Sequence, residues 1–453
     1  MERREFLRAL GGSAIGLAAA SGAFGEDSVT GYVAPVPADT GASGQVVVIG
    51  GGMAGATVAK YLRVWGGAKV KVTLVERESV YVSNIMSNLV LNGSRTISGL
   101  TYNWDKLASN YGIDRVQGEV VGVDRTKHQV VLATGAKLGY DKLVIAPGID
   151  FDRIPGIDTD ALQARFPHAW KAGAQTTTLR DQIRAMTSRD TFVMTIPKAP
   201  YRCPPGPYER ACVVADWLKR NRRGAQVIVL DENAAITAET ASFERAFTQT
   251  HAGVITYVPN AIVNHIDPGS STVFTAMGEF KGKVINPIPR QRAPRLLYDV
   301  RLVNDTGVPG QTVGDVRWSL VDPKTYEFID NGAGTGPAPD VHIIGDPANH
   351  GLPKAGHVAN QEAKVCADAI TRMLRGDLPD QNPVTNSACY SPITFETASW
   401  LTAVYRYNSG ERKMETFRND ANVLAAGEAA SASKDNFEQM NKWFRQLMAD
   451  TYA

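Results

Sequence analysis

Two stretches of the chain share one pattern of apolar and polar positions. A short apolar run at 46–49 (VVVI) is followed by a helical stretch at 56–62 and a second apolar run at 70–76 (VKVTLVE). The same order returns between residues 191 and 232. Apolar strands that alternate with helices are typical of βαβ units around a parallel sheet. We therefore predict an α/β protein with two Rossmann-like dinucleotide-binding domains.

The C-terminal part follows a different pattern. Residues 395–408 (FETASWLTAVYRYN) predict strands, and residues 434–453 predict an amphipathic helix because apolar side chains recur there at spacings of three and four. The apolar positions are Phe437, Met440, Trp443, Phe444 and Leu447. We predict a small α+β interface domain here.

The chain has 453 residues, which is enough for two to four domains. We assign 44–165 and 316–383 to an FAD-binding domain, 166–315 to a second, degenerate NAD-like Rossmann domain, and 384–453 to the C-terminal domain.

The first βαβ unit contains a glycine fingerprint. Gly50, Gly52 and Gly55 give G-x-G-x-x-G between strand and helix, and Glu76 follows 21 residues after Gly55. The first glycine allows a tight turn, the second lets a pyrophosphate approach the backbone, and the third lets helix and strand pack closely. The pyrophosphate then meets free N–H groups at a helix N-terminus, and the Glu76 carboxylate binds a ribose.

Two later segments indicate FAD rather than NAD. Residues 140–148 (YDKLVIAPG) form a strand and small-residue turn, and 341–345 form a strand before Asp346. A helix that begins near Lys354–Gly356 would direct its positive end at the flavin. The predicted cofactor-binding residues are Gly50, Gly52, Met53, Ala54, Gly55, Glu76, Arg77, Asn84, Val121, Ala146, Gly148, Asp346, Lys354, Ala355 and Gly356.

The corresponding turn of the second unit has no such fingerprint. It reads PKAPYRCPPGP at 197–207. Proline has no N–H and is rigid, so this turn is unsuited to cradle a pyrophosphate, and NAD(P)H is not the expected redox partner. The turn instead presents Cys203 near a helix start, with Pro207 in the first turn. The helix dipole and Arg202 would both favour the thiolate.

Composition and charge exclude some classes of partner. The net charge of +2 and the lack of a long basic run predict no nucleic-acid binding. Arg3 and Arg4 precede a short, glycine-rich apolar stretch that predicts a twin-arginine export signal at 1–25, too short for a transmembrane segment. We expect a flexible linker at 26–43 and a periplasmic location.

The ordered motifs resemble the flavoprotein subunit of flavocytochrome c sulfide dehydrogenase, a relative of sulfide:quinone oxidoreductases. The segments that carry the resemblance are VVVIGGGMAGATVAKYL, GYDKLVIAPGIDF, FPHAWKAGAQT, YRCPPGPYERA, VINPIPRQRA, VHIIGDPA, PKAGHVANQEAKV and NSACYS. The resemblance implies a glutathione-reductase-like fold and an FAD enzyme. Such an enzyme oxidises sulfide and passes electrons to a separate c-type cytochrome subunit, expected to be dihaem. It also implies that Cys203 is the catalytic residue, because the family's matching cysteine forms a redox disulfide beside the flavin.

The chain departs from that family at two positions. Asn84 stands where the family attaches FAD through a cysteine, so we expect non-covalent FAD. The family's second redox cysteine is absent between Asp346 and Lys354. Cys203 then either acts alone, or pairs with Cys389 or Cys212, or the donor is not sulfide.

Other candidates and alternatives stay open from the sequence. His350 and His357 flank GLPKAG and are either proton carriers beside the flavin or ordinary loop histidines. Cys366 is expected in the core. The sequence has no C-x-x-C-H and no metal-ligand spacing, so we expect no haem and no metal in this chain. The alternative functions are a flavin dehydrogenase for a non-sulfur donor and a non-catalytic electron-transfer subunit.

Overall fold

The computed structural model describes residues 32–307, 314–332, 334–419 and 421–453. The predicted export signal and the first part of the linker lie outside these residues. In the part of the chain that is described, no helix is both long and apolar enough to cross a membrane.

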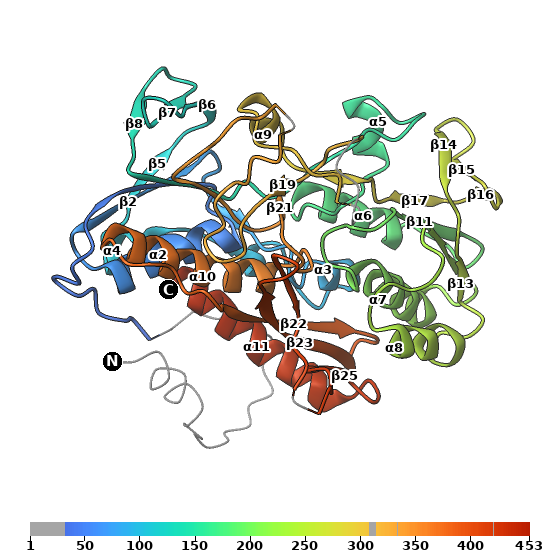
Figure 1. Ribbon diagram of the computed structural model, residues 1–453. Helices are drawn as coiled ribbons and strands as arrows, with labels where there is room; N and C mark the ends of the chain where they lie inside the picture. The colour runs from blue at the N-terminus through green and yellow to red at the C-terminus, as the bar shows by residue number, and fades with distance from the viewer. Residues whose placement is uncertain (1–31, 308–313, 333, 420) are drawn as a thin grey trace.

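The FAD-binding domain is built on a five-stranded parallel sheet. In spatial order its strands are β20 (Val341–Ile343), β9 (Lys142–Ile145), β1 (Gly44–Ile49), β2 (Val70–Glu76) and β5 (Asp114–Gln117). Val46, Val47 and Val48 of β1 are at most 2% exposed, because both faces of a central parallel strand are covered. Helices α2 (Met53–Gly66) and α10 (Gly356–Leu374) lie side by side on one face (Figure 1).

The second domain repeats this design with four parallel strands. Their order is β13 (Ile255–Val258), β12 (Gln226–Asp231), β11 (Thr191–Ile196) and β17 (Val284–Pro287). The helices of this domain are α6 (Ala174–Arg184), α7 (Gly206–Asn221) and α8 (Thr240–Arg245), the last continued by a π-type turn, η2 (Ala246–Thr250). Helix α5 (Asp160–Arg165) precedes the assigned boundary at 166, but its Leu162 packs on the core of the second domain. The predicted βαβ unit is therefore confirmed as β11–α7–β12, and Pro207 lies in the first turn of α7.

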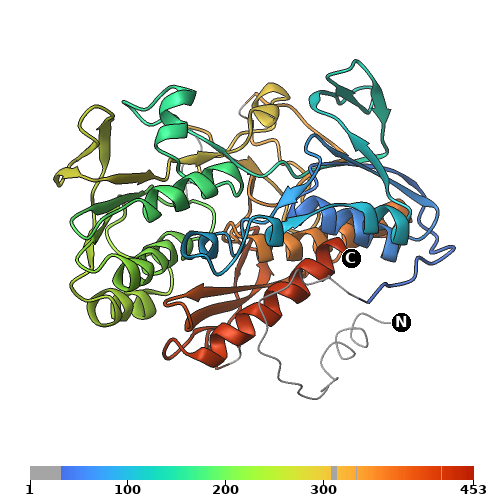
Figure 2. The same cartoon turned by 180° about the vertical axis from the view of Figure 1, so that it is seen from behind.

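The C-terminal domain is an antiparallel sheet with one long helix packed on it, as predicted (Figure 2). Its elements are β22 (Val384–Pro392), β23 (Ala398–Asn408), β24 (Lys413–Thr416), β25 (Ala426–Glu428) and α11 (Lys434–Tyr452). Met440, Phe444 and Leu447 form the buried stripe of α11. Both views place the end of α11 beside α2.

Smaller elements complete the three domains. Two antiparallel meanders project from the Rossmann sheets: β6 (Val120–Asp124), β7 (Gln129–Leu132) and β8 (Lys137–Gly139), and β14 (Val263–Asp267), β15 (Thr272–Thr275) and β16 (Gly278–Lys281). The others are β3 (Tyr81–Val82), α3 (Asn88–Asn92), η1 (Ser98–Leu100), β4 (Thr101–Tyr102), α4 (Asp105–Tyr111), β10 (Asp150–Phe151), β18 (Gln291–Arg292), α9 (Arg295–Asp299), β19 (Ser319–Leu320) and β21 (Ala348–Asn349).

The chain returns from the second domain earlier than the assigned boundary at 315. Strand β18 pairs with β10, the segment by which the chain leaves the FAD-binding domain. Beyond it, Asn349 Nδ2 donates to Asp305 Oδ1 at 2.7 Å, and β19 pairs with β21. Residues 291–315 therefore include contacts to the FAD-binding domain that sequence periodicity does not indicate.

The end of the predicted linker is not a flexible segment. Pro37 O accepts a hydrogen bond from the Ala68 N–H at 2.8 Å, and Thr40 Oγ1 donates to Gly66 O at 2.6 Å. Ala42 is fully buried. This part packs against the C-terminal end of α2, where Thr40 Oγ1 satisfies the Gly66 carbonyl that the helix end leaves free and Pro37 O accepts the Ala68 N–H.

Candidate functional site

The turn between β1 and α2 requires glycine at two of its three fingerprint positions. Gly50 has φ +97°, and a Cβ there would lie 2.4 Å from Ala146 O. A Cβ on Gly55 would lie 1.8 Å from Gly50 O. These two residues give the tight turn and the close helix–strand approach that the sequence predicts. Ala146 is brought to the same turn because β9 pairs with β1.

Gly52 leaves space where a pyrophosphate would bind. It is the N-cap of α2, no side chain caps this helix, and the nearest atom to an added Cβ is Tyr81 Cε2 at 3.8 Å. The N–H groups at the start of a helix favour an anion. The Glu76 carboxylate accepts the Gly51 N–H at 2.7 Å and the Glu78 N–H at 2.9 Å, and its remaining lone pairs suit a ribose hydroxyl. The donor set and the open cradle fit FAD.

Aromatic side chains from distant segments surround this turn. Trp104 Nε1 and the Tyr452 hydroxyl both donate to Gly51 O, at 2.8 and 3.1 Å. The Tyr452 ring stacks on Tyr81 and Tyr102 with centroid separations of 5.3 and 5.4 Å. Sequence reasoning missed Trp104 and Tyr452, because no motif ties the end of α11 to the glycine turn.

The segment before α10 meets the glycine turn, as predicted. A Cβ on Gly345 would lie 3.2 Å from Ala54 Cβ, and one on Gly356 would lie 3.6 Å from Met53 Cγ. The Gly345 N–H donates to Glu362 Oε2 at 2.7 Å. Helix α10 begins at Gly356 with Ala355 as its N-cap. The two helix N-termini therefore converge on one region.

Lys354 fixes the loop that leads into α10. Its Nζ donates to Asp346 O at 2.7 Å and to Ala348 O at 2.9 Å, and it lies 3.9 Å from the centroid of the Trp318 ring. Burial lowers the pKa of Lys354 to about 8. The Lys354 side chain therefore stabilises the conformation of residues 346–354 through these two hydrogen bonds.

The remaining predicted FAD residues occupy two kinds of environment. Asn84 Oδ1 accepts the Ala172 N–H at 2.8 Å, and Gly148 lies in open space at the end of β9. By contrast, the side chain of Arg77 is 57% exposed and pairs with Glu78, and Val121 on β6 is 52% exposed. The side chains of Arg77 and Val121 therefore face solvent.

The loop of the second unit contacts the FAD-binding domain through Cys203. The Cys203 N–H donates to Lys354 O at 2.7 Å, and Arg202 pairs with Asp346 at 3.4 Å. Cys203 has φ +59°, a conformation that an L-residue other than glycine rarely adopts. Strained residues of this kind persist only where their surroundings enforce them. The two domains thus meet at the predicted catalytic cysteine.

The predicted thiolate character of Cys203 is wrong for this state. Burial raises the pKa of Cys203 well above its usual range, and the nearby Cys389 and Glu209 raise it further. Arg202 and the Gly206 N–H lower it, but they do not outweigh burial. Cys203 is therefore a neutral thiol here, because loss of hydration penalises the charged form more than one cation compensates.

A buried polar network, missed by sequence reasoning, fixes the walls around Cys203. Arg210 is 1% exposed and donates to His168 O and Ala169 O, each at 2.7 Å. Arg210 Nε donates to Asn88 Oδ1 at 2.9 Å, and Asn88 Nδ2 donates to Glu209 Oε1 at 2.8 Å. Glu209 and Arg210, which are adjacent in α7, therefore connect this helix to α3 and to the loop at 168–170.

Both histidines weighed from the sequence have structural partners. His350 Nε2 lies 3.1 Å from Glu362 Oε1, and His357 Nδ1 accepts the Ala388 N–H at 3.2 Å. Burial lowers the pKa of His357 to about 4, so this imidazole is neutral at physiological pH. Cys212 and Cys366 are fully buried, the latter as predicted. Over the described ranges, no three His, Cys, Asp or Glu side chains cluster as a metal site would require.

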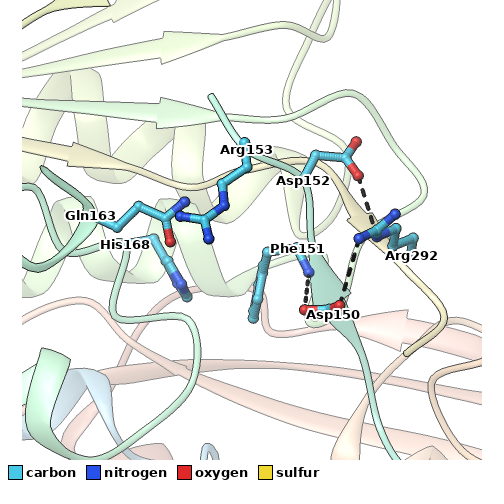
Figure 3. A pocket seen from close by; sticks show the side chains of 7 residues that line it. All are labelled: Asp150, Phe151, Asp152, Arg153, Gln163, His168 and Arg292. Carbon is cyan, nitrogen blue, oxygen red and sulfur yellow. Dashed lines mark hydrogen bonds and ion pairs between the residues drawn. The ribbon is translucent and has the colours of Figure 1, made fainter. Parts of the chain in front are cut away.

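A cavity of about 610 Å³ lies at the strands that connect the two domains (Figure 3). It is lined by Asp150, Phe151, Asp152, Arg153, Gln163, His168 and Arg292. The His168 and Phe151 rings are 4.2 Å apart. Burial lowers the pKa of His168 to about 3, and Arg210 and Arg202 lower it further. Among the lining residues, His168 belongs to the segment whose carbonyl groups Arg210 binds.

Comparison with protein families identifies three parts of the chain. Residues 44–185 match the pyridine nucleotide-disulphide oxidoreductase family. Residues 176–289 match the central region of the sulfide dehydrogenase [flavocytochrome c] flavoprotein chain, and residues 381–452 match the flavin-binding region of flavocytochrome c sulphide dehydrogenase. The resemblance inferred from the motifs and the FAD-dependent oxidoreductase class are confirmed.

Solved structures with similar folds cover most of the chain. The sulfide:quinone oxidoreductase of Aquifex aeolicus is 16% identical, with a TM-score of 0.66, over 90% of this chain and 91% of that one. An NAD-dependent persulfide reductase from A. fulgidus is 15% identical, with a TM-score of 0.55, over 90% and 77%. The predicted two-domain Rossmann-like fold is confirmed.

A curated relative matches a short part. Ferroptosis suppressor protein 1 of Taeniopygia guttata is 32% identical over 108 residues, which is 23% of this chain. The match spans 27% of that relative.

Proposed function

We propose that this FAD-dependent oxidoreductase is the flavoprotein subunit of an exported sulfide dehydrogenase. It oxidises sulfide, or a related reduced sulfur compound, at Cys203 and passes the electrons to a separate c-type cytochrome. The observation that supports this most is the hydrogen bond from the Cys203 N–H to Lys354 O at 2.7 Å. It attaches the thiol-bearing loop to the segment that leads into α10, whose N-terminus lies beside the glycine turn.

The residues around Cys203 would have separate roles in such a reaction. Cys203 Sγ would form an S–S bond with the substrate sulfur as two S–H protons leave and the electron pair goes to FAD when it is bound, and the rigid proline loop and the Arg210 network hold Cys203 in place. Arg202, paired with Asp346, lowers the pKa of Cys203 and so favours the nucleophilic thiolate against the effect of burial. The glycine turn, Glu76 and the N-termini of α2 and α10 would hold FAD, which supplies a two-electron acceptor when bound.

The cellular setting of the proposal rests on the sequence. Arg3 and Arg4 before a short apolar stretch support twin-arginine export to the periplasm, a route that carries folded proteins. Asn84, where the family has its flavin-linked cysteine, supports non-covalent FAD. The family descriptions matched by 176–289 and 381–452 name a flavocytochrome, which supports a cytochrome partner.

Anaerobic reduction of the FAD-loaded protein tests this function. Sulfide should bleach the flavin absorbance, and oxidised c-type cytochrome should then restore it. Cys366→Ala, which alters a fully buried thiol of α10, serves as the matched control and should bleach like the unaltered protein. Lack of bleaching by sulfide at any pH would overturn the substrate assignment, and bleaching by a non-sulfur donor would favour the alternative dehydrogenase.

A further inference from the structure

Gln291 has a buried side-chain amide of which only one end is hydrogen-bonded. The residue begins β18 and is 2% exposed. Its Oε1 accepts the Arg202 N–H at 2.7 Å, whereas its Nε2 is buried and has no hydrogen-bond partner among the residues that the structure describes. A backbone N–H can only donate, so the end of the amide that meets Arg202 is the oxygen. The unpaired end is therefore an N–H donor.

The backbone of Gln291 is held from two sides. Its carbonyl oxygen accepts Arg317 Nε at 3.0 Å, and Arg317 is itself paired with Asp152. In the pairing of β18 with β10, Gln291 lies opposite Phe151. Together with the bond to Arg202, these contacts fix both the main chain and the orientation of the amide. The free N–H is therefore a property of the packed structure and does not come from a loose side chain.

Two segments that are predicted to contact FAD are connected to this amide. Phe151, the residue opposite Gln291, follows three positions after Gly148, where an added Cβ would meet nothing within 4 Å. Arg202, whose N–H holds the amide oxygen, pairs through its guanidinium group with Asp346 at 3.4 Å. The amide is therefore linked through β10 to one side of the predicted flavin site and through Arg202 to another.

A buried donor without a partner is costly to the folded protein. Burial of an unpaired amide N–H costs about 1–3 kcal/mol, and nearly all buried polar groups in native proteins have a partner. The polar edge of a flavin ring presents carbonyl oxygens and ring nitrogens that accept hydrogen bonds. A flavin bound at this site would therefore remove the cost, since it supplies the kind of acceptor that the Gln291 amide lacks.

We propose that Gln291 Nε2 donates a hydrogen bond to an acceptor atom of the bound flavin ring and raises the reduction potential of the flavin. The acceptor atoms of the ring gain negative charge on reduction, so an N–H donor stabilises the reduced form more than the oxidised form. The N–H of Arg202, the residue before Cys203, sets the orientation of this donor. The proposal needs only bound FAD and holds whatever compound supplies the electrons.

Nuclear magnetic resonance of the side-chain amides tests this bond without relying on activity. The full chain is prepared with ¹⁵N-labelled glutamine, and the Gln291 signal is the one that disappears in Gln291→Met. Addition of FAD to the apoprotein should shift this signal downfield and slow its exchange with solvent, and reduction with dithionite should shift it again. Gln182 is the control, because its Nε2 already donates to Arg165 O at 2.8 Å and its signal should stay in place. A Gln291 signal that FAD leaves unchanged overturns the proposal.

The midpoint potential of the bound flavin gives a second readout. Gln291→Met removes the donor and the acceptor, whereas Gln291→Glu keeps an oxygen for the Arg202 N–H and removes only the donor. Both variants should lower the potential, measured against a reference dye, and Gln182→Met should not. If only Gln291→Met lowers it, the side chain merely positions the Cys203 loop and the proposal is wrong. If neither variant changes the potential but both slow flavin reduction by sulfide, the amide acts on the substrate, which also contradicts the proposal.

Discussion

The two βαβ units of this protein have the same strand order and opposite chemistry at their first turn. In the first unit, an added Cβ on Gly52 would meet its nearest neighbour at 3.8 Å, so space remains for a phosphate. In the second, a Cβ on Gly206 would lie 2.7 Å from Cys203 Sγ and 3.0 Å from the Trp170 ring. The helix start that is open to an anion in one unit is thus filled by a thiol and an indole in the other.

The first turns of the two helices show the same contrast. Helix α2 has no acidic residue in its first turn, which suits an anionic ligand. Helix α7 carries Glu209 there, buried and bonded to Asn88. The same βαβ fold can therefore carry two different sites. Side chains in the first turn of the helix determine whether its N-terminus is open to an anionic ligand, as in α2, or packs against other residues of the protein, as in α7.

The largest effect should come from Gly55→Ala in the first unit. Its Cβ would lie 1.8 Å from Gly50 O, a backbone atom that has no room to move. We expect a loss of about 3 kcal/mol or more of unfolding free energy and no retained FAD, measured by chemical denaturation and flavin absorbance. Gly139→Ala, at a position with nothing within 4 Å, is the control. A stable, yellow Gly55→Ala protein would contradict the close approach described for this turn.

Cys203→Ser should abolish the reaction with sulfide at the second unit and leave FAD binding at the first unit unchanged. The serine hydroxyl does not form a persulfide, so the rate of flavin reduction by sulfide should fall on the order of a hundredfold or more. FAD content should not change, because the glycine turn is untouched. Stopped-flow bleaching measures the rate, and an unchanged rate would remove Cys203 from the chemistry.

Gly52→Ala should separate folding from cofactor binding within the first unit. The protein has room for the methyl group, since the nearest atom is 3.8 Å away and φ is −72°. The methyl group would occupy the space assigned to the pyrophosphate, so FAD affinity should fall at least about tenfold, or about 1.4 kcal/mol. Fluorescence titration of the apoprotein measures this. An unchanged affinity would place the pyrophosphate elsewhere.

Glu209→Gln should change the pH dependence of stability. Burial raises the pKa of Glu209 to about 8. Between about pH 4.5 and 8 the folded protein keeps a proton that the unfolded chain releases, so stability decreases as pH rises through this window. The amide should remove this contribution, which is at most about 1.4 kcal/mol per pH unit for one proton. Urea unfolding at several pH values tests it, and identical slopes in both proteins would contradict it.

The sequence predicted the first unit far better than the surroundings of the second. The glycine spacing, the start of α10 near Lys354 and the proline turn that carries Cys203 follow from local residue chemistry. The roles of Arg210, Tyr452 and Trp104 depend on contacts between segments far apart in the chain, which have no local signature. The expected thiolate was wrong because a helix start and an arginine are visible in sequence, whereas burial is not.

The most direct test compares sulfide and NADH as reductants of one FAD-loaded preparation under anaerobic conditions. If the second unit presents a thiol instead of a nucleotide site, sulfide should bleach the flavin through Cys203, and NADH should leave its absorbance unchanged over the same time. Two results together would contradict this account, in which the first unit binds FAD and the second presents the reactive thiol. They are rapid bleaching of the flavin by NADH and an unaltered rate of flavin reduction by sulfide in Cys203→Ser.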